Sequence, residues 1–355
     1  DPLPELGPDG IVEVLPAALT QVVVSIDTGA LPPGDYEAAL ELSSLLDGSW
    51  RQALPVSLRL LPYRLPPLSG VDIADCYGFI DYARPAMLAA GVNTFTIPVA
   101  WIDAEFSREG VLERFDSSRV ASHVTGLLAD LPEARFHVLN LQGLYRDLRT
   151  RHGLQPDSAA FQDALRAWLQ RLTAEMQALG VPPGRLIIET FDEPGPGDLA
   201  TALAMARQVK AAVPGVQTHF YASGITDSPD WTAAAAAHDI VAPAVGQCTP
   251  EAMERLKALG TRLWVYDCQA YGESLHPLAY YRLMPWMCWH YGIRGWSHFH
   301  WFNTSHGRPY RAWDGVEAQN LVYPSRPGMA PVLSRRYLAL RAGHDDYRLL
   351  QAVAA

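Results

Sequence analysis

The sequence has 355 residues, of which 49% are hydrophobic and 19% charged, a composition typical of a globular protein with a sizeable core. Its formal net charge of −10 argues against nucleic acid or an anionic membrane as a partner, because both favour basic protein surfaces. The most apolar run starts at Thr232 and is interrupted by His238, Asp239 and Pro243, so no membrane span is predicted.

The four cysteines, Cys76, Cys248, Cys268 and Cys288, show no Cys-x-x-Cys spacing, which argues against a zinc knuckle or a thioredoxin-type redox site. We expect buried free thiols instead. The chain begins at Asp1 rather than Met, which indicates a processed or trimmed product. A removed signal peptide would leave no trace, so export or a cell-surface location stays open, as does the oligomeric state.

Residues 1–65 contain short runs in which apolar and polar residues alternate, a pattern typical of β-strands. The runs begin at Ile11, Gln21, Asp35 and Arg51. Turn sequences such as LPPGD (31–35) separate them. We predict a small antiparallel β-sandwich over residues 1–65 as an accessory domain, followed by a proline-rich linker, YRLPPLSG (63–70).

From Gly70 onward, eight short apolar strands alternate with segments that carry apolar residues every three or four positions, the period of a helix. The predicted strands begin at Val71, Asn93, Arg135, Arg185, Val216, Asp239, Thr261 and Ile293. Their number and the chain length match the α/β class and the (β/α)8 TIM barrel, which we predict over residues 66–355. An open doubly wound sheet would need a glycine-rich phosphate loop after its first strand, and DCYGFIDYA (75–83) does not supply one.

The predicted fourth strand lies in RLIIETFDEPGPGD (185–198) and ends on two adjacent acids, Asp192 and Glu193. In such a barrel the carboxyl ends of the strands form the active site. Pro194 and the glycines after it permit a bend that could aim both carboxylates into the mouth, where different surroundings would separate their pKa values. In the alternative interpretation, Asp192 caps the next helix and Glu193 is a solvated acid, although Asp198 is better placed for that cap.

Other predicted strand ends supply aromatic rings, which stack on sugar CH faces, and amides, which bond sugar hydroxyls. The candidate substrate-binding residues are Trp101, Asn140, Tyr221, Gln247, Tyr266, Asp267, Trp301 and Asn303, with the Asp267 carboxylate as a further group that could bond sugar hydroxyls. Any one of them could be a core aromatic or a loop amide. The prediction of a sugar-binding site therefore depends on their placement together at the strand ends.

His298 and His300 share one face of the predicted eighth strand, a spacing that can hold a metal. No neighbouring strand offers a matching pair with ligand-like spacing, so we expect hydrogen-bonded histidines and neither a metal nor a cofactor. The sequence also contains no Gly-x-Ser-x-Gly elbow, no P-loop and no His-Glu-x-x-His helix. Serine hydrolase, nucleotide hydrolase and zinc protease functions therefore lack their usual motifs.

Four segments together resemble glycoside hydrolase family 123. They are FDEPGPGD (191–198), LWVYDCQ (263–269), LMPWMCWHYGIRGW (283–296) and NLVYPSRPGMAPVLSRRYLALRAGHDDYRLL (320–350). The resemblance covers most of residues 70–350, and LPPGDYEAALELSS (31–44) resembles the sandwich domain that precedes the barrel in those proteins.

The resemblance implies an exo-acting β-N-acetylhexosaminidase, in particular an N-acetyl-β-galactosaminidase, that acts on an oligosaccharide or glycoconjugate by substrate assistance. Glu193 would protonate the departing glycosidic oxygen and later activate water. Asp192 would accept a hydrogen bond from the acetamido N–H and orient the acetamido oxygen toward the anomeric carbon. Because the substrate carries the nucleophile, no pair of carboxylates 5 Å apart is required.

The sequence departs from the family pattern in two places. The eighth strand, GWSHFHWFN (295–303), leaves either Phe299 or Trp301 as the aromatic floor of the sugar site. Asp267 stands on the seventh strand where a neutral residue is expected, so a direct retaining glycosidase with Glu193 as acid/base and Asp267 as nucleophile is an alternative. A carbohydrate-binding protein that has lost catalysis is the other alternative.

Overall fold

The computed structural model describes residues 2–3, 10–13, 22–45, 50–76, 83–222, 224–268, 277–302, 320–323 and 331–354. The chain divides into two compact units, one of residues 5–67 and one of residues 68–354 together with residues 1–4. In the larger unit, β1 (Pro2–Leu3) pairs antiparallel with β15 (Val332–Ser334). No helix in the described part of the chain is long and apolar enough to cross a membrane.

The smaller unit contains one antiparallel pair, β2 (Gly34–Ser43) and β3 (Arg51–Leu60). Residues 22–28, which the sequence pattern predicts as a strand, are not in a strand, and the predicted strand at 11–16 lies partly outside the described residues. Within the described residues the sandwich prediction therefore holds for one two-stranded sheet only. Most side chains of β2 and β3 are exposed, because the described residues of this unit form no second layer against which the pair could pack.

The larger unit is a closed barrel of eight parallel strands, as predicted. In chain order they are β4 (Asp72–Ala74), β5 (Thr94–Pro98), β8 (Arg135–Leu139), β9 (Leu186–Asp192), β10 (Gln217–Ala222), β11 (Ile240–Pro243), β12 (Arg262–Asp267) and β13 (Gly295–His298). Pairing of β13 with β4 closes the ring. Every strand begins within two residues of its predicted start, since the apolar runs and the turn residues between them are local signals.

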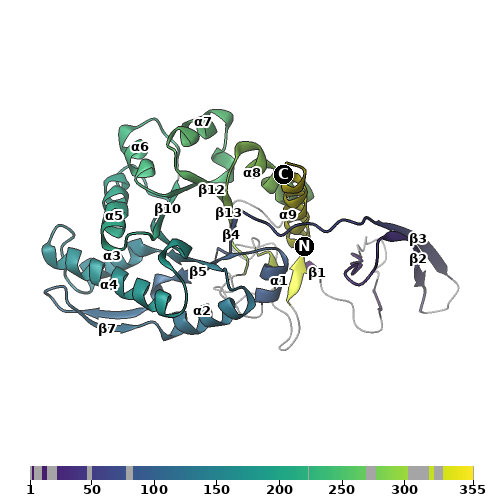
Figure 1. Cartoon of the computed structure of the whole chain (residues 1–355), viewed down its shortest axis with the longest axis horizontal. Helices are drawn as coiled ribbons and strands as arrows, with labels where there is room; N and C mark the ends of the chain where they lie inside the picture. Colours follow the sequence, from purple (N-terminus) through teal and green to yellow (C-terminus); the bar gives the residue numbers. More distant parts are fainter. Residues whose placement is uncertain are drawn as a thin grey trace. The chain divides into compact units, whose positions relative to one another are not determined.

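Helices follow the strands and cover the outside of the barrel; Figure 1 shows α5, α6 and α7 outside β10 and β12. The helices are α1 (Arg84–Ala89), α2 (Ser118–Asp130), α3 (Leu141–Thr150), α4 (Ala159–Ala178), α5 (Leu199–Ala212), α6 (Pro229–Ala236), α7 (Pro250–Ala258), α8 (Pro277–Tyr291) and α9 (Arg335–Ala354). The hydroxyls of Ser158, Ser228 and Thr249 cap α4, α6 and α7. A hairpin of β6 (Asp103–Phe106) and β7 (Leu112–Asp116) precedes α2, and β14 (Val322–Tyr323) pairs with β15.

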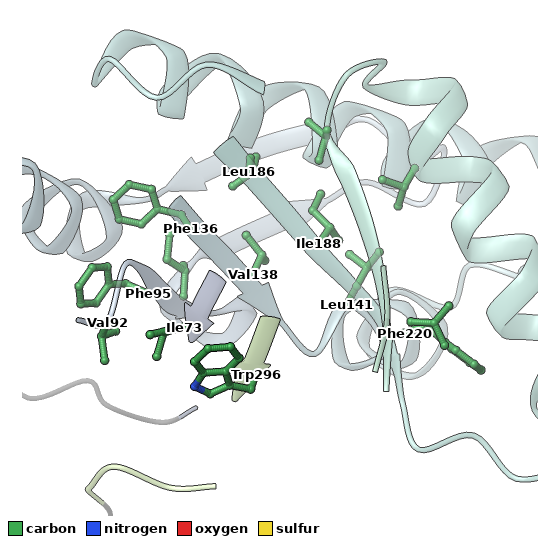
Figure 2. Close-up of a cluster of buried hydrophobic side chains, with 14 of the residues drawn as sticks. Ile73, Val92, Phe95, Phe136, Val138, Leu141, Leu186, Ile188, Phe220 and Trp296 are labelled. Carbon is green, nitrogen blue, oxygen red and sulfur yellow. The ribbon is translucent and has the colours of Figure 1, made fainter. Parts of the chain in front are cut away.

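The strands divide their apolar side chains between two cores. Phe136 and Ile188 belong to the large core between strands and helices, part of which is drawn in Figure 2. Ile187 and Trp264 belong to a smaller cluster inside the barrel. Adjacent residues lie in different cores because the side-chain period of a strand is two. Trp264 fits inside because the residue opposite it on β13 is Gly295, where a Cβ would collide with the indole ring.

Candidate active site

A cavity of about 270 Å³ lies at the carboxyl ends of the barrel strands. Its lining residues are Cys76, Leu139, Asn140, Gln142, Glu189, Asp192, Glu193, Tyr221, Tyr266, Cys268, Ser297 and Phe299. They lie on, or shortly after, six of the eight strands, which is where barrel enzymes place their active sites.

A second, larger hollow of about 420 Å³ lies beside α3 and shares only Asn140 with the first. Several of its charged side chains are engaged in ion pairs: Arg151 contacts Asp147 at 3.8 Å and also pairs with Glu105, and Asp103 pairs with Arg114. We take the smaller cavity as the candidate site because its acids have no cation beside them among the described lining residues.

Asp192 and Glu193 both line this cavity. Asp192 is the last residue of β9, and Glu193 follows with φ at 46°, in the left-handed region that residues other than glycine rarely adopt. In this turn the Glu193 N–H donates to the Tyr221 carbonyl oxygen at 3.2 Å, and the Tyr266 hydroxyl donates to the Glu193 carboxylate. Backbone strain of this kind is concentrated at functional sites, so it supports a functional role for Glu193.

The acids on β9 repel one another. Asp192 is open to solvent through the mouth, but the protein walls around its carboxylate raise its pKa, and the charge of Glu193 raises it further. Glu189 is only 3% exposed, and burial, followed by the charge of Asp192, raises its pKa well above the usual value. Burial and like-charge repulsion therefore favour the protonated forms of Asp192 and Glu189.

Amide groups from the segment that follows β8 approach the acids. Asn140 directly follows β8 with φ at 70°, and its N–H donates to Glu189 Oε1 at 3.1 Å. The side-chain oxygen of Gln142 accepts from the N–H of Asp192, also at 3.1 Å. Both residues line the cavity, so their positions fix the acids and border the space where a ligand would lie.

Aromatic rings also line the cavity. The Tyr221 and Tyr266 rings meet edge to face with centroids 4.9 Å apart, and the Tyr221 hydroxyl lies 3.3 Å from Ser297 Oγ. Phe299 also lines the cavity, whereas Trp301 is 1% exposed and packs in the outer core near Tyr337. Of the two rings considered for the floor of the sugar site, Phe299 is therefore the one at the cavity.

Trp101, which the sequence places among the substrate-binding residues, lies elsewhere. Its ring contacts two side chains of α2: His123, at a centroid distance of 5.1 Å, and the Arg119 guanidinium, 4.2 Å from the ring centroid. It lies after β5 as predicted, but the following turn directs it to the helix layer.

Two amides also differ from expectation. Gln247 is not among the lining residues; with its amide oriented to suit its neighbours, it bonds the Ala222 carbonyl at 3.2 Å and the Gly224 N–H at 3.0 Å. Asn303 lies outside the described residues.

Asp267 faces away from the cavity. It alternates with Tyr266, which lines the cavity, and it is 2% exposed. The Tyr280 hydroxyl donates to Asp267 Oδ1 at 2.6 Å, and His298 Nδ1 lies 3.3 Å from Oδ2. These neighbours place the carboxylate between the barrel wall and α8.

His298 and His300 do not share a strand face, because β13 ends at His298. A different group of metal-ligand side chains comes together: His137 on β8, Glu189 on β9 and His219 on β10. Sequence analysis missed this group because one residue comes from each of three strands. The available signal was a single histidine at the third position of β8 and of β10, each with a neutral residue on either side.

Comparison with known proteins gave one family match. Residues 140–353, more than half of the chain, match the glycoside hydrolase 123 catalytic domain. A search of curated protein sequences returned no match.

Solved glycoside hydrolases share the fold at low sequence identity. A family 39 glycoside hydrolase from the gut symbiont Bacteroides cellulosilyticus WH2 aligns with a TM-score of 0.52 and 13% identity over 88% of this chain and 71% of that chain. An endo-1,4-beta-mannanase from Rhizomucor miehei aligns with a TM-score of 0.50 and 10% identity over 79% and 95%. These similarities support the barrel fold, and the family match supplies the identity: the chain belongs to glycoside hydrolase family 123 and is a glycosidase with a carbohydrate substrate.

Proposed function

We propose that this glycosidase is an exo-acting β-N-acetylhexosaminidase, in particular an N-acetyl-β-galactosaminidase, that uses substrate assistance. The observation that carries the proposal is the arrangement of the acids: Asp192 and Glu193 are adjacent, line one cavity and are accompanied only by Glu189 from the same strand. Among the described lining residues no carboxylate comes from another strand. A direct retaining mechanism needs a second carboxylate across the scissile bond, about 5–5.5 Å from the first.

In the proposed reaction Glu193 donates its proton to the glycosidic oxygen as the bond from that oxygen to the anomeric carbon breaks. The acetamido oxygen of the substrate forms a new bond to the anomeric carbon, while Asp192 accepts a hydrogen bond from the acetamido N–H. Glu193 then takes a proton from water, which attacks the anomeric carbon and reopens the oxazolinium-type ring with net retention. The Tyr266 hydroxyl, bonded to Glu193, holds the carboxyl group in place.

The cavity supports action at a chain end. Its volume of about 270 Å³ is just below the usual range for ligand sites, about 300–1,000 Å³. A single sugar unit flanked by Tyr221, Tyr266 and Phe299 suits this space.

The orientation of Asp267 argues against the direct retaining alternative, because a nucleophile has to reach the substrate. Its Oδ1 already accepts from Tyr280, and the residue is 2% exposed. A 2-fluoro sugar that labelled Asp267 covalently would restore that alternative.

The test compares nitrophenyl N-acetyl-β-galactosaminide, its gluco epimer and nitrophenyl β-galactoside. We expect wild type to cleave an acetamido sugar and to leave the plain galactoside nearly intact. Glu193→Gln should lower kcat roughly 10²–10⁴-fold, and the loss should shrink for a dinitrophenyl leaving group, which needs less protonation. Glu133→Gln, which removes a surface carboxylate that is 90% exposed, is the control.

Two outcomes would contradict the proposal. Cleavage of the plain galactoside with both acetamido substrates untouched would exclude substrate assistance. Tight sugar binding with no turnover, unchanged by Glu193→Gln, would instead indicate a carbohydrate-binding protein that has lost catalysis.

A further inference from the structure

The interior of the barrel contains a compact group of potential metal ligands beneath the acids. In the parallel pairing, His219 lies opposite Glu189, and His137 lies opposite Ile187, two residues before Glu189. All three therefore point to the same side of the sheet, the side of Ile187 in the inner core. One ligand atom from each residue lies within 4.8 Å of those of the other two.

Within the part of the chain that the structure describes, neither imidazole has a hydrogen-bond partner. His137 and His219 are 0% exposed, and none of their four ring nitrogens has a hydrogen-bond partner among the described residues. A buried polar atom without a partner costs free energy, so most such atoms in folded proteins are satisfied by a protein group, a water or an ion. Two adjacent histidines in this condition, beside a carboxylate, indicate that a ligand completes the cluster.

We propose that His137, Glu189 and His219 bind one zinc-type divalent transition-metal ion inside the barrel. Two imidazoles and one carboxylate form a donor set that zinc uses, and the nitrogen donors disfavour magnesium and calcium. Zinc–ligand bonds of about 2.0–2.2 Å place the ligand atoms of a tetrahedral site roughly 3.4 Å apart, so the three side chains have to rotate toward one another, by up to about 1.4 Å at the ligand atoms, when the ion binds.

The surroundings fit a bound ion. The His219 ring contacts the Tyr221 ring at 4.4 Å and the Trp264 ring at 5.2 Å between centroids, so aromatic walls enclose the cluster. Glu189 also lines the cavity, which gives the ion an entry path and leaves room for a further ligand. The ion would join β8, β9 and β10 directly, and we therefore expect it to stabilise the barrel.

The experiment measures metal content and unfolding of the full chain, with no use of the glycosidase activity. The protein is stripped with a chelator, incubated with Zn²⁺, desalted and analysed for bound metal. We expect about one equivalent in wild type and a rise in the thermal unfolding midpoint with Zn²⁺ concentration. Co²⁺ should give the visible absorption of a four- or five-coordinate site in place of that of the hexa-aquo ion.

Matched variants assign the site. Glu189→Gln keeps the shape of the side chain and removes the anionic ligand, and His219→Gln removes one imidazole; each should weaken binding at least about tenfold. His238→Gln is the control, because His238 is also buried but has both nitrogens engaged, by the Ala234 carbonyl at 2.7 Å and the Thr190 hydroxyl at 2.6 Å.

The proposal fails if wild type retains no metal, or if Glu189→Gln and His219→Gln retain as much metal as His238→Gln. The first result would mean that buried water satisfies the imidazoles, and the second that metal binds elsewhere on the chain. If His219→Gln does not fold, the metal retained by Glu189→Gln, compared with that retained by His238→Gln, decides whether the cluster binds the ion. Because hydrolysis is never measured, failure here leaves the proposed hexosaminidase activity untouched.

Discussion

Asp72 and Asp75 lie at opposite ends of β4, three residues apart, and both carboxyl groups are buried. At the amino end, Asp72 contacts Arg135 at 3.2 Å and Arg262 at 2.7 Å. Burial raises the pKa of Asp72, and the two guanidinium groups oppose that rise. The contact links three strands, β4, β8 and β12.

At the carboxyl end, Asp75 accepts the Thr96 N–H on one oxygen, and its other oxygen has no partner among the described residues. Burial raises the pKa of Asp75 to about 8, and no cation opposes it. Glu189 and Asp192 on β9, together with Glu193 directly after it, have no cation beside them among the described lining residues of the cavity either. The two ends of the barrel therefore differ: the buried acid at the amino end is paired with arginines that link neighbouring strands, and the buried acids at the carboxyl end, where the candidate active site lies, have no such partner among the described residues.

The largest predicted effect on stability concerns Asp75. Its folded pKa of about 8 exceeds the reference value of 3.8, so the protonated form stabilises the fold fully below about pH 4, and that contribution is lost as the pH rises toward 8. The loss is at most about 1.4 kcal/mol per pH unit. Asp75→Asn cannot ionise, so urea unfolding from pH 4 to 8 should show a shallower decline than in wild type. If the free energy of unfolding fell equally with pH in wild type and in Asp75→Asn, the buried Asp75 carboxyl group would not be the source of the pH dependence, and the difference between the two barrel ends would be contradicted.

Arg135→Met tests the amino end of the barrel, where Asp72 is paired with two arginines. Removing one partner of a buried ion pair costs about 3 kcal/mol, at the low end of the usual range because Arg262 still faces Asp72. Denaturant unfolding at neutral pH measures the loss, and kcat per folded molecule should not change. The double variant Asp72→Asn with Arg135→Met should recover part of the stability. A double variant no better than Arg135→Met alone would show that the pair is not coupled.

Asp192→Asn tests the carboxyl end of the barrel, where the acids have no cation beside them among the described lining residues. It should have the smallest effect on stability of the three substitutions. Because burial and Glu193 raise the pKa of Asp192, its ionised form destabilises the fold near neutral pH. The substitution should raise the free energy of unfolding by about 0.5 kcal/mol, since solvent at the mouth screens the repulsion. Hydrolysis of the acetamido substrate should fall about 100-fold. A fall in both stability and activity would indicate that Asp192 holds the fold instead of serving the reaction.

Several features of the site could be predicted from the sequence because they depend on the local chain. The apolar runs define the eight strands, and the Asp192–Glu193 pair ends the fourth of them. Tyr221 and Tyr266 lie near strand ends and line the cavity. Trp101 lies just as close to a strand end, but it turns to the helix layer. Position along the chain sets the height of a residue in the barrel, whereas its direction depends on the turn that follows.

The cluster of His137, Glu189 and His219 shows the same limit inside the barrel. Each residue stands alone in its own strand, and the three meet only through the register of β8, β9 and β10. In the N-terminal segment a local pattern was present but the structure did not follow it, since residues 22–28 alternate like a strand but do not form one. An alternating pattern needs a second layer to bury its apolar face.

By itself the sequence determined the order of strands and helices and the acidic pair at the end of the fourth strand, because periodicity and turn residues act over a few positions. It also carried the family resemblance that the match over residues 140–353 bears out. Only the tertiary structure decided that Asp267 faces α8, that Phe299 rather than Trp301 borders the cavity, and that two histidines meet Glu189. Those outcomes depend on strand register and on closure of the barrel, which bring together residues that are far apart in the chain.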